Sequence, residues 1–208
     1  ESKIVIFFNQ FLFDLTFFSF LTEMGNGFFA TAILIPCLSI LSSKLKINYV
    51  PVQLMIVPAL CIGLDVQFLK YILSFERPAS ILTDEIIFLE PIFIAGSFPS
   101  GHAATVLSVI LIWLSFALND LKSKESKTIF SFFILIALSV ALSRVIIGAH
   151  WFSDILGSLA LVLMAIAIFN INFIKAFFEK SIFFKYFSFM LIGLSWIGIL
   201  FFDISDYL

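Results

Sequence analysis

The sequence predicts an all-α integral membrane protein in which six transmembrane helices form one bundle, preceded by an N-terminal helix that lies in the membrane interface. The first observation is composition: 62% of the 208 residues are hydrophobic and 12% are charged, whereas soluble domains carry about 25% charged residues. The second is a mean hydropathy of +1.15. The third is a series of apolar runs, each of roughly the length that crosses a bilayer. This composition excludes a disordered chain, a nucleic-acid-binding domain and a disulfide scaffold.

The N-terminal segment is the ambiguous one. Residues 4–22 are rich in Phe but carry Asn9, Gln10 and Asp14 in their middle. An ionisable residue at mid-membrane is costly unless it is paired, which favours an interfacial helix over a seventh span. We therefore divide the chain into residues 1–26, an N-terminal interfacial or additional transmembrane helix, and residues 27–208, a membrane-embedded domain.

The six spans are separated by short charged turns and by one long loop at residues 71–100. No internal repeat is visible, and the loops are too short to hold a second domain. The spans run approximately over residues 27–44, 48–69, 101–119, 128–147, 153–173 and 185–203.

The basic residues predict the orientation, because Lys and Arg concentrate in short cytoplasmic loops. With the turns 42–48, 120–127 and 175–185 in the cytoplasm, eight of the ten lysines lie inside: Lys44, Lys46, Lys122, Lys124, Lys127, Lys175, Lys180 and Lys185. The 71–100 loop, the 147–153 turn and the acidic end 203–208 then lie outside. Three cations near the outer face, Lys70, Arg77 and Arg144, are exceptions that need a cause.

The first polar segment runs from Lys70 to Pro78. Lys70 and Arg77 are seven residues apart and share a face if the helix continues that far. Pro78 predicts that the helix ends at Arg77. The alternative interpretation is that two cations snorkel from a helix end.

The second segment is Pro99-Ser100-Gly101-His102, directly before a span. Ser100 suits a helix N-cap, and Gly101 lets an oxyanion approach the backbone, so that unpaired N–H groups and the positive end of the helix dipole form an anion site. The alternative is an ordinary helix start beside an interfacial histidine.

The third segment runs from Ser143 and Arg144 through a tight turn at Gly148 to His150 and Asp154. Because His150 and Asp154 are four apart, Asp154 can accept a hydrogen bond from one ring nitrogen and leave the other with its lone pair outward. The alternative is a first-turn acid favoured by the helix dipole beside an interfacial histidine.

Taken together, the three segments meet at one membrane surface, because two spans separate the second from the third. They supply three cations, a helix N-terminus, two histidines and one carboxylate, with no carboxylate or cysteine cluster for a metal. Three cations suit a phosphoryl group, and two histidines suit an attacking group and a proton donor.

These segments resemble the type 2 phosphatidic acid phosphatase superfamily, which also contains the vanadium haloperoxidases. Every fixed position of its signature, K-x6-R-P, P-S-G-H and S-R-x5-H-x3-D, is met in motifs at 70–78, 99–102 and 143–154. With the interleaved spans, the resemblance covers roughly residues 27–172.

The resemblance implies a metal-independent phosphoric monoester or diphosphate hydrolase that needs no cofactor. His150 is then the nucleophile, Asp154 orients it, and His102 protonates the leaving group before water releases phosphate. The implied phosphate-binding residues are Lys70, Arg77, Arg144, Ser100 and the Gly101 amide. Glu76 and Ala79-Ser80 stand where many members carry further basic residues, which disfavours a substrate with many extra phosphates.

The implied activity is that of an integral membrane lipid phosphatase acting on a phospholipid, a polyprenyl diphosphate or a lipid A type substrate. In a bacterium, the resemblance implies the inner membrane with a periplasm-facing site. The expected partners are the lipid phosphate substrate and membrane lipids, with no nucleic acid and no obligate protein partner. The alternatives are a lipid phosphotransferase that passes the phosphoryl group to an acceptor lipid, a non-catalytic lipid carrier and a vanadate-dependent oxidase.

Overall fold

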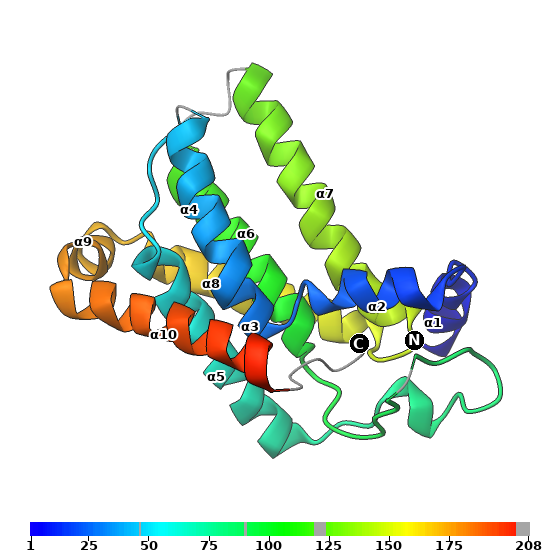
Figure 1. The fold of residues 1–208 in the computed structure, drawn as a ribbon. Coiled ribbons are helices and arrows are strands. Elements are labelled where there is room, and N and C mark those ends of the chain that lie inside the picture. Colours follow the sequence, from blue (N-terminus) through cyan, green and yellow to red (C-terminus); the bar gives the residue numbers. More distant parts are fainter. Residues whose placement is uncertain (46, 90, 119–123, 203–208) are drawn as a thin grey trace.

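The regular elements of the protein are all helical over the residues that the computed structural model describes, 1–45, 47–89, 91–118 and 124–202 (Figure 1). Lys46, Lys122 and the acidic end 203–208, which the orientation argument uses, lie outside these residues. The helices are α1 (Ser2–Asn9), α2 (Leu15–Glu23), α3 (Gly27–Phe29), η1 (Ala30–Leu34), α4 (Ile35–Lys44), α5 (Gln53–Leu73), η2 (Pro78–Ser80), α6 (Gly101–Ala117), α7 (Lys124–Ile146), α8 (Phe152–Phe169), α9 (Asn172–Lys180) and α10 (Ile182–Phe201).

Helices lie where the sequence predicts the six spans, but they differ in length. The described residues contain five helical segments long and apolar enough to cross a membrane: Gly27–Lys44, Gln53–Ser80, Lys124–Ile146, Phe152–Phe169 and Ile182–Phe201. The first of these is composite, because α3, the π-helical turn η1 and α4 follow one another without a break. The second segment consists of α5, the non-helical residues 74–77 and η2. The sixth, α6, has 17 residues, which rise about 26 Å against a hydrocarbon core of about 30 Å. The structure thus supports five spanning helices, one fewer than the sequence predicts.

The N-terminal segment forms two short helices rather than one long one. Asp14 explains the break, because its side chain accepts a hydrogen bond from the Phe17 amide at 2.8 Å and caps the start of α2. The helices have 8 and 9 residues, less than half of the roughly 20 that a bilayer crossing needs. Both pack on α7.

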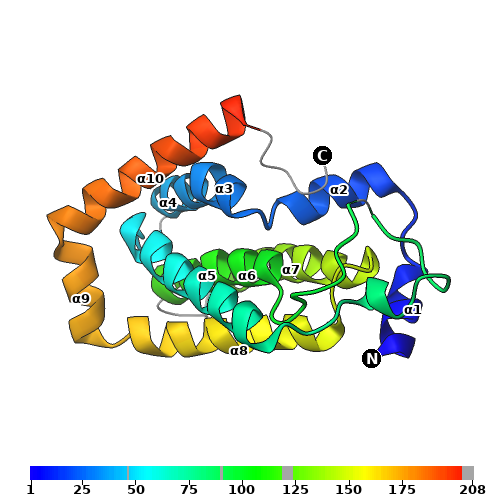
Figure 2. The ribbon, with the colours of Figure 1, turned by 90° about the horizontal axis from the view of Figure 1, so that it is seen from below.

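Helix α6 is the centre of the bundle, with α5, α7 and α8 packed around it (Figure 2). Most of its side chains are buried, and the fully buried Trp113 packs edge-on against Phe133 of α7 with ring centroids 4.8 Å apart. Helix α10 packs on α3, η1 and α5. Large apolar side chains such as Tyr71, Phe173 and Phe201 are exposed, as expected for a protein whose solvent is lipid.

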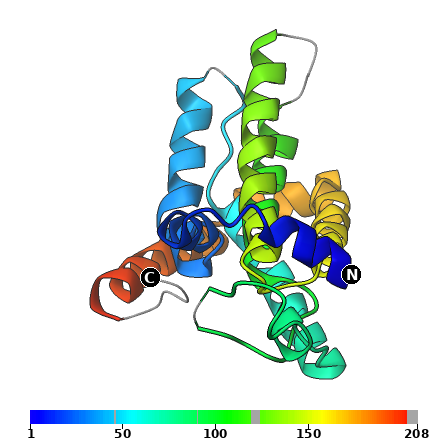
Figure 3. The ribbon, with the colours of Figure 1, turned by 90° about the vertical axis from the view of Figure 1, so that its right-hand side faces the viewer.

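The described lysines of the predicted cytoplasmic turns lie away from the three motifs. Figures 1 and 3 show the end of α4 and the start of α7 projecting in the same direction, and these tips carry Lys44 and Lys124. Helix α9 lies at the motif-free ends of α5 and α6, because the Gln53 side chain donates to the Glu179 carbonyl and Lys175 lies over the Phe116 ring. The described lysines of the predicted cytoplasmic turns therefore gather at the helix ends opposite the motifs.

Candidate active site

The three motifs meet in one cavity of about 680 Å³. It lies where α5 and α7 end and where α6 begins, with the turn between α7 and α8 completing the polar side. Among the predicted site residues, those that line the cavity are Lys70, Arg77, Gly101, His102, Arg144 and His150. Ser100 and Asp154 are buried directly behind this lining.

Lys70 and Arg77 do not share a helix, because the helix ends before Arg77 and the condition for a common helical face is not met. The predicted helix end at Arg77 is therefore wrong. Helix α5 ends at Leu73, and Ser74 adopts a left-handed conformation with φ 43°. Arg77 is extended, as the residue before Pro78 prefers. Two backbone hydrogen bonds, from Arg77 N to Ile94 O and from Ser97 N to Phe75 O, hold this extended segment beside the end of the long loop.

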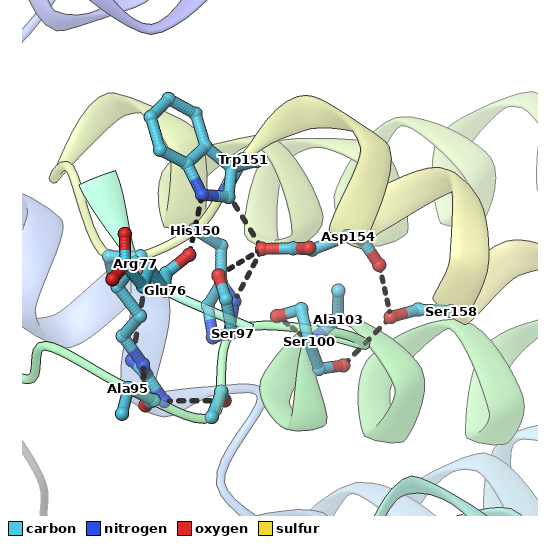
Figure 4. Close-up of polar contacts among 12 residues, drawn as sticks. Glu76, Arg77, Ala95, Ser97, Ser100, Ala103, His150, Trp151, Asp154 and Ser158 are labelled. Atoms are coloured by element: carbon cyan, nitrogen blue, oxygen red, sulfur yellow. Dashed lines mark hydrogen bonds and ion pairs between the residues drawn. The ribbon is translucent and has the colours of Figure 1, made fainter. Parts of the chain in front are cut away.

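The guanidinium of Arg77 is fixed by backbone carbonyls (Figure 4). Its Nε donates to the Ala95 carbonyl at 2.9 Å, and its terminal nitrogens donate to the carbonyls of Ala149 and Gly96 at 3.3 and 3.4 Å. It also lies over the Phe93 ring, 5.1 Å from the centroid. Since these contacts come from the loop and from the α7–α8 turn, Arg77 joins both to the cavity wall.

The Pro-Ser-Gly-His segment starts α6 as predicted. Ser100 is the N-cap, and its hydroxyl accepts from the Ala103 amide at 3.5 Å. The hydroxyl is thereby turned toward the helix, and Ser100 is fully buried. A Cβ added at Gly101 would meet only Val66, at 3.9 Å. The first amides of α6 are therefore open to a ligand in the cavity, where the helix dipole favours an anion.

His150 and Asp154 form the predicted pair. A tight turn at Gly148, with φ 74°, brings His150 back toward the cavity. A Cβ at Gly148 would lie 2.8 Å from the Phe88 ring, so the turn needs glycine for close approach as well as for conformation. Nδ1 of His150 lies 3.1 Å from Asp154 Oδ2 (Figure 4). When Nδ1 donates this bond, Nε2 keeps its lone pair and is the ring nitrogen left to face the cavity.

Asp154 is itself held by two further donors. The same Oδ2 accepts from the Trp151 amide at 2.9 Å and from the Ser97 hydroxyl. The Trp151 indole N–H donates to the Glu76 carbonyl at 2.8 Å and so joins the third motif to the first. Ser158 donates to the Ser100 carbonyl at 2.8 Å and joins α8 to α6. This network leaves the carboxylate little freedom to turn away from His150.

The surroundings keep His150 neutral. Burial, followed by the positive charges of Arg77, Arg144 and Lys70, holds the pKa of His150 well below its usual value. A neutral imidazole has the lone pair that a nucleophile or a base requires.

Several residues of the site carry no signal in the sequence. Thr22 accepts a hydrogen bond from the buried Arg144 at 2.7 Å, and Glu23 lies 3.9 Å from His102. Ser97 stands beside a motif, but its residue type and spacing do not single it out. No periodicity links residues 22 and 23 to motifs some 80 to 120 positions later.

The donor set suits an anion rather than a cation. Within the part of the chain that the structure describes, no three His, Cys, Asp or Glu side chains lie close enough to hold a metal ion. The cavity wall instead offers two guanidinium groups, an ammonium group and helix N-terminal amides, which bind phosphoryl oxygens well.

Comparison with known proteins agrees with the predicted resemblance. The family model described as the PAP2 superfamily matches residues 48–178, more than half of the chain. The crystal structure of Aquifex aeolicus LpxE is similar in fold, with a TM-score of 0.62 and 21% sequence identity over 80% of this chain and 92% of that chain. A search of curated protein sequences found no match. The family match confirms the resemblance drawn from the three motifs, and the chain belongs to the PAP2 superfamily.

Proposed function

We propose that the protein is a metal-independent lipid phosphatase that works through a phosphohistidine at His150. The observation that carries this proposal is the relation between His150 and the cavity. Nδ1 is held by Asp154 at 3.1 Å, while the ring borders a cavity lined by Lys70, Arg77 and Arg144. A neutral, oriented nucleophile facing three cations is suited to attack on a phosphorus atom.

In the first step, Nε2 of His150 forms a bond to phosphorus as the bond from phosphorus to the leaving oxygen breaks. A ring proton of His102 moves to that oxygen. In the second step, His102 takes a proton from water, whose oxygen attacks phosphorus and displaces His150. Lys70, Arg77, Arg144 and the Gly101 amide at the start of α6 stabilise the charge on the phosphoryl oxygens in both transition states. Ser100 acts from behind, because its amide donates to the Asp154 carbonyl at 3.3 Å and its hydroxyl caps α6.

The rest of the cavity supports a lipid substrate. Away from the polar end, its walls are largely apolar: Ile35, Ile56, Leu60, Leu64, Val109 and Leu191. An acyl or polyprenyl chain can occupy this part while the phosphate reaches His150. A phospholipid, a polyprenyl diphosphate and a lipid A type substrate all have this division between phosphate and chain.

We further propose that the cavity opens at the outer face of the membrane, which in a bacterial inner membrane is the periplasmic face. The basis is the gathering of the described lysines at the opposite helix ends, which the positive-inside rule assigns to the cytoplasm.

The test is incubation of the purified, detergent-solubilised protein with a panel of lipid phosphates, scored for free phosphate and for the dephosphorylated lipid. We expect release from at least one lipid and none from the His150→Ala variant. Release from no lipid would contradict the proposal, as would equal release by the variant. Loss of substrate phosphate to an added lipid alcohol, with little free phosphate, would identify a phosphotransferase instead.

A further inference from the structure

The C-terminal end of α2 packs directly on the first turn of α6. Glu23, the last residue of α2, is buried, and its Oε1 lies 3.9 Å from Nε2 of His102. Two residues later, a Cβ added at Gly25 would lie 2.7 Å from the His102 carbonyl oxygen. Only a glycine lets the chain approach this closely, so the contact between residues 22–26 and His102 is a tight one.

The position of Glu23 is electrostatically unfavourable in isolation. A carboxylate at the C-terminal end of a helix faces the negative end of the helix dipole. Burial adds a desolvation cost that only a partner of opposite charge offsets. The imidazole of His102 lies beside Glu23 and supplies such a charge when its ring is protonated.

His102, for its part, faces a strongly positive cavity. Lys70, Arg77 and Arg144 line the same space, and none of the described residues that line it is Asp or Glu. Like charges disfavour a protonated histidine. The carboxylate of Asp154 is already engaged by His150, Trp151 and Ser97. A negative charge beside His102 offsets this repulsion, and the Glu23 carboxylate lies 3.9 Å from its Nε2.

We infer that Glu23 is a positioning residue. Its carboxylate stabilises the protonated ring of His102 and orients that ring toward the leaving oxygen, so that the N-terminal segment completes the active site. This inference rests on the proposed function. Glu23 lies outside residues 48–178, which the family model matches.

The proton balance follows from the chemistry of the ring. Both nitrogens of an imidazolium carry a proton, so Nε2–H can remain toward Glu23 while the Nδ1 proton moves to the leaving oxygen as its bond to phosphorus breaks. The neutral ring then takes a proton from the attacking water at Nδ1, and Glu23 again stabilises the imidazolium.

The first experiment compares leaving groups. Glu23→Gln keeps the size of the side chain and removes its charge, and Glu23→Asp keeps the charge on a shorter side chain. The assay measures hydrolysis of phosphate monoesters by the wild-type and variant proteins. The alcohols of these esters range from 4-nitrophenol to an alkanol. We expect Glu23→Gln to lose at least about tenfold in kcat/KM for the alkyl ester, a part of the roughly 10²–10⁴-fold that general acid catalysis contributes, and far less for the 4-nitrophenyl ester. Glu23→Asp should recover part of the loss.

The loss in kcat/KM on the alkyl ester is divided by the loss on the 4-nitrophenyl ester. This ratio does not depend on how much of the sample is folded, so a reduced yield of folded variant does not change it. If Glu23→Gln yields no folded protein, the same ratio is measured for Glu23→Asp, and it tests whether the loss depends on the leaving group. Glu85→Gln is the control: it removes an exposed carboxylate of the long loop and should leave kcat/KM for the alkyl ester and for the 4-nitrophenyl ester unchanged. An equal loss for all leaving groups would overturn the inference while the phosphatase activity of the wild type stands.

The second experiment asks whether Glu23 acts through His102. In a His102→Ala background, the additional Glu23→Gln change should cost no further activity on the alkyl ester, because the group that it positions is gone. A further loss as large as that in the wild-type background would show a purely structural role. Absence of activity in the wild type on every ester and lipid would instead refute the proposed function itself.

Discussion

Thr22 and Arg144 are joined by a hydrogen bond of 2.7 Å although 122 positions separate them in the sequence. The bond runs from a terminal guanidinium nitrogen of Arg144 to the Thr22 hydroxyl, and both residues are buried. It connects the N-terminal segment to the third motif and fixes the orientation of the Arg144 guanidinium, which lines the cavity. The end of α2 is therefore part of what gives the cavity its shape.

Removal of the Thr22 hydroxyl should loosen Arg144. Thr22→Val keeps the shape of the side chain but offers no acceptor to a charged donor, and hydrogen bonds to charged groups contribute about 1.5–3 kcal/mol. We expect kcat/KM to fall by about 13- to 160-fold, which is that range converted at about 1.36 kcal/mol per factor of ten, with Thr22→Ser close to wild type. Equal activities of the Val and Ser variants would show that this bond does not position Arg144.

The pH dependence should report the environment of His150. Since burial and three cations lower the pKa of His150, the ring stays neutral as the pH falls through the usual histidine value, and activity is lost only at lower pH. Lys70→Met removes one of these cations and should raise the pKa, which moves the acid limb of kcat/KM toward higher pH.

Both proteins are assayed with one substrate, so the ionisation of the substrate cancels in the comparison. Lys124→Met, at the far end of α7, is the matched control and should not move the limb. An acid limb that Lys70→Met leaves in place, or moves toward lower pH, would contradict the assigned role of these charges.

The orientation can be tested with single cysteines. In a background without Cys37 and Cys61, Thr83→Cys places a thiol in the exposed 71–100 loop, and Ser43→Cys places one at the exposed end of α4 beside Lys44. We expect an impermeant thiol reagent to label position 83 but not position 43 in intact cells, and both after lysis. Labelling of position 43 alone would place the cavity in the cytoplasm.

Inhibition should follow the donor set of the cavity. Vanadate adopts a five-coordinate geometry similar to the phosphoryl transition state, so we expect it to bind more tightly than phosphate and activity to survive a chelator. Arg144→Lys should weaken vanadate binding by about 1.5–3 kcal/mol, because a planar fork that holds two oxygens becomes a single point donor. Loss of activity on chelation that Mg²⁺ restores would indicate a metal-dependent enzyme.

Local spacing is what made the motifs predictable. The four-residue spacing of His150 and Asp154 led to an expected hydrogen bond, and the two side chains lie 3.1 Å apart. Ser100 was expected to cap a helix, and it caps α6. Such expectations succeed because they depend only on the backbone geometry within a turn or two, which residue type and spacing largely determine.

Long-range contacts and irregular backbone could not be predicted in this way. Helix α5 ends at Ser74 in a left-handed conformation without the glycine that usually marks such an end. Asn9 was interpreted only as a polar residue unsuited to a span, yet its side chain donates to the carbonyls of Ile87 and Ile146 and accepts from the Ile87 amide. Glu23 carries no spacing relation to His102. In each case tertiary contacts, rather than local propensity, decide the conformation.

The proposed mechanism requires a covalent bond between phosphorus and Nε2 of His150, and this bond can be trapped. The wild-type protein is mixed with substrate, quenched in alkali within the first turnovers and digested for mass spectrometry. A phosphoryl group bound to imidazole nitrogen survives alkali and is lost in acid. We predict a phosphorylated peptide that carries the modification at His150, absent from His150→Ala. Steady phosphate release by the wild type with no modified His150 at any quench time would contradict the account.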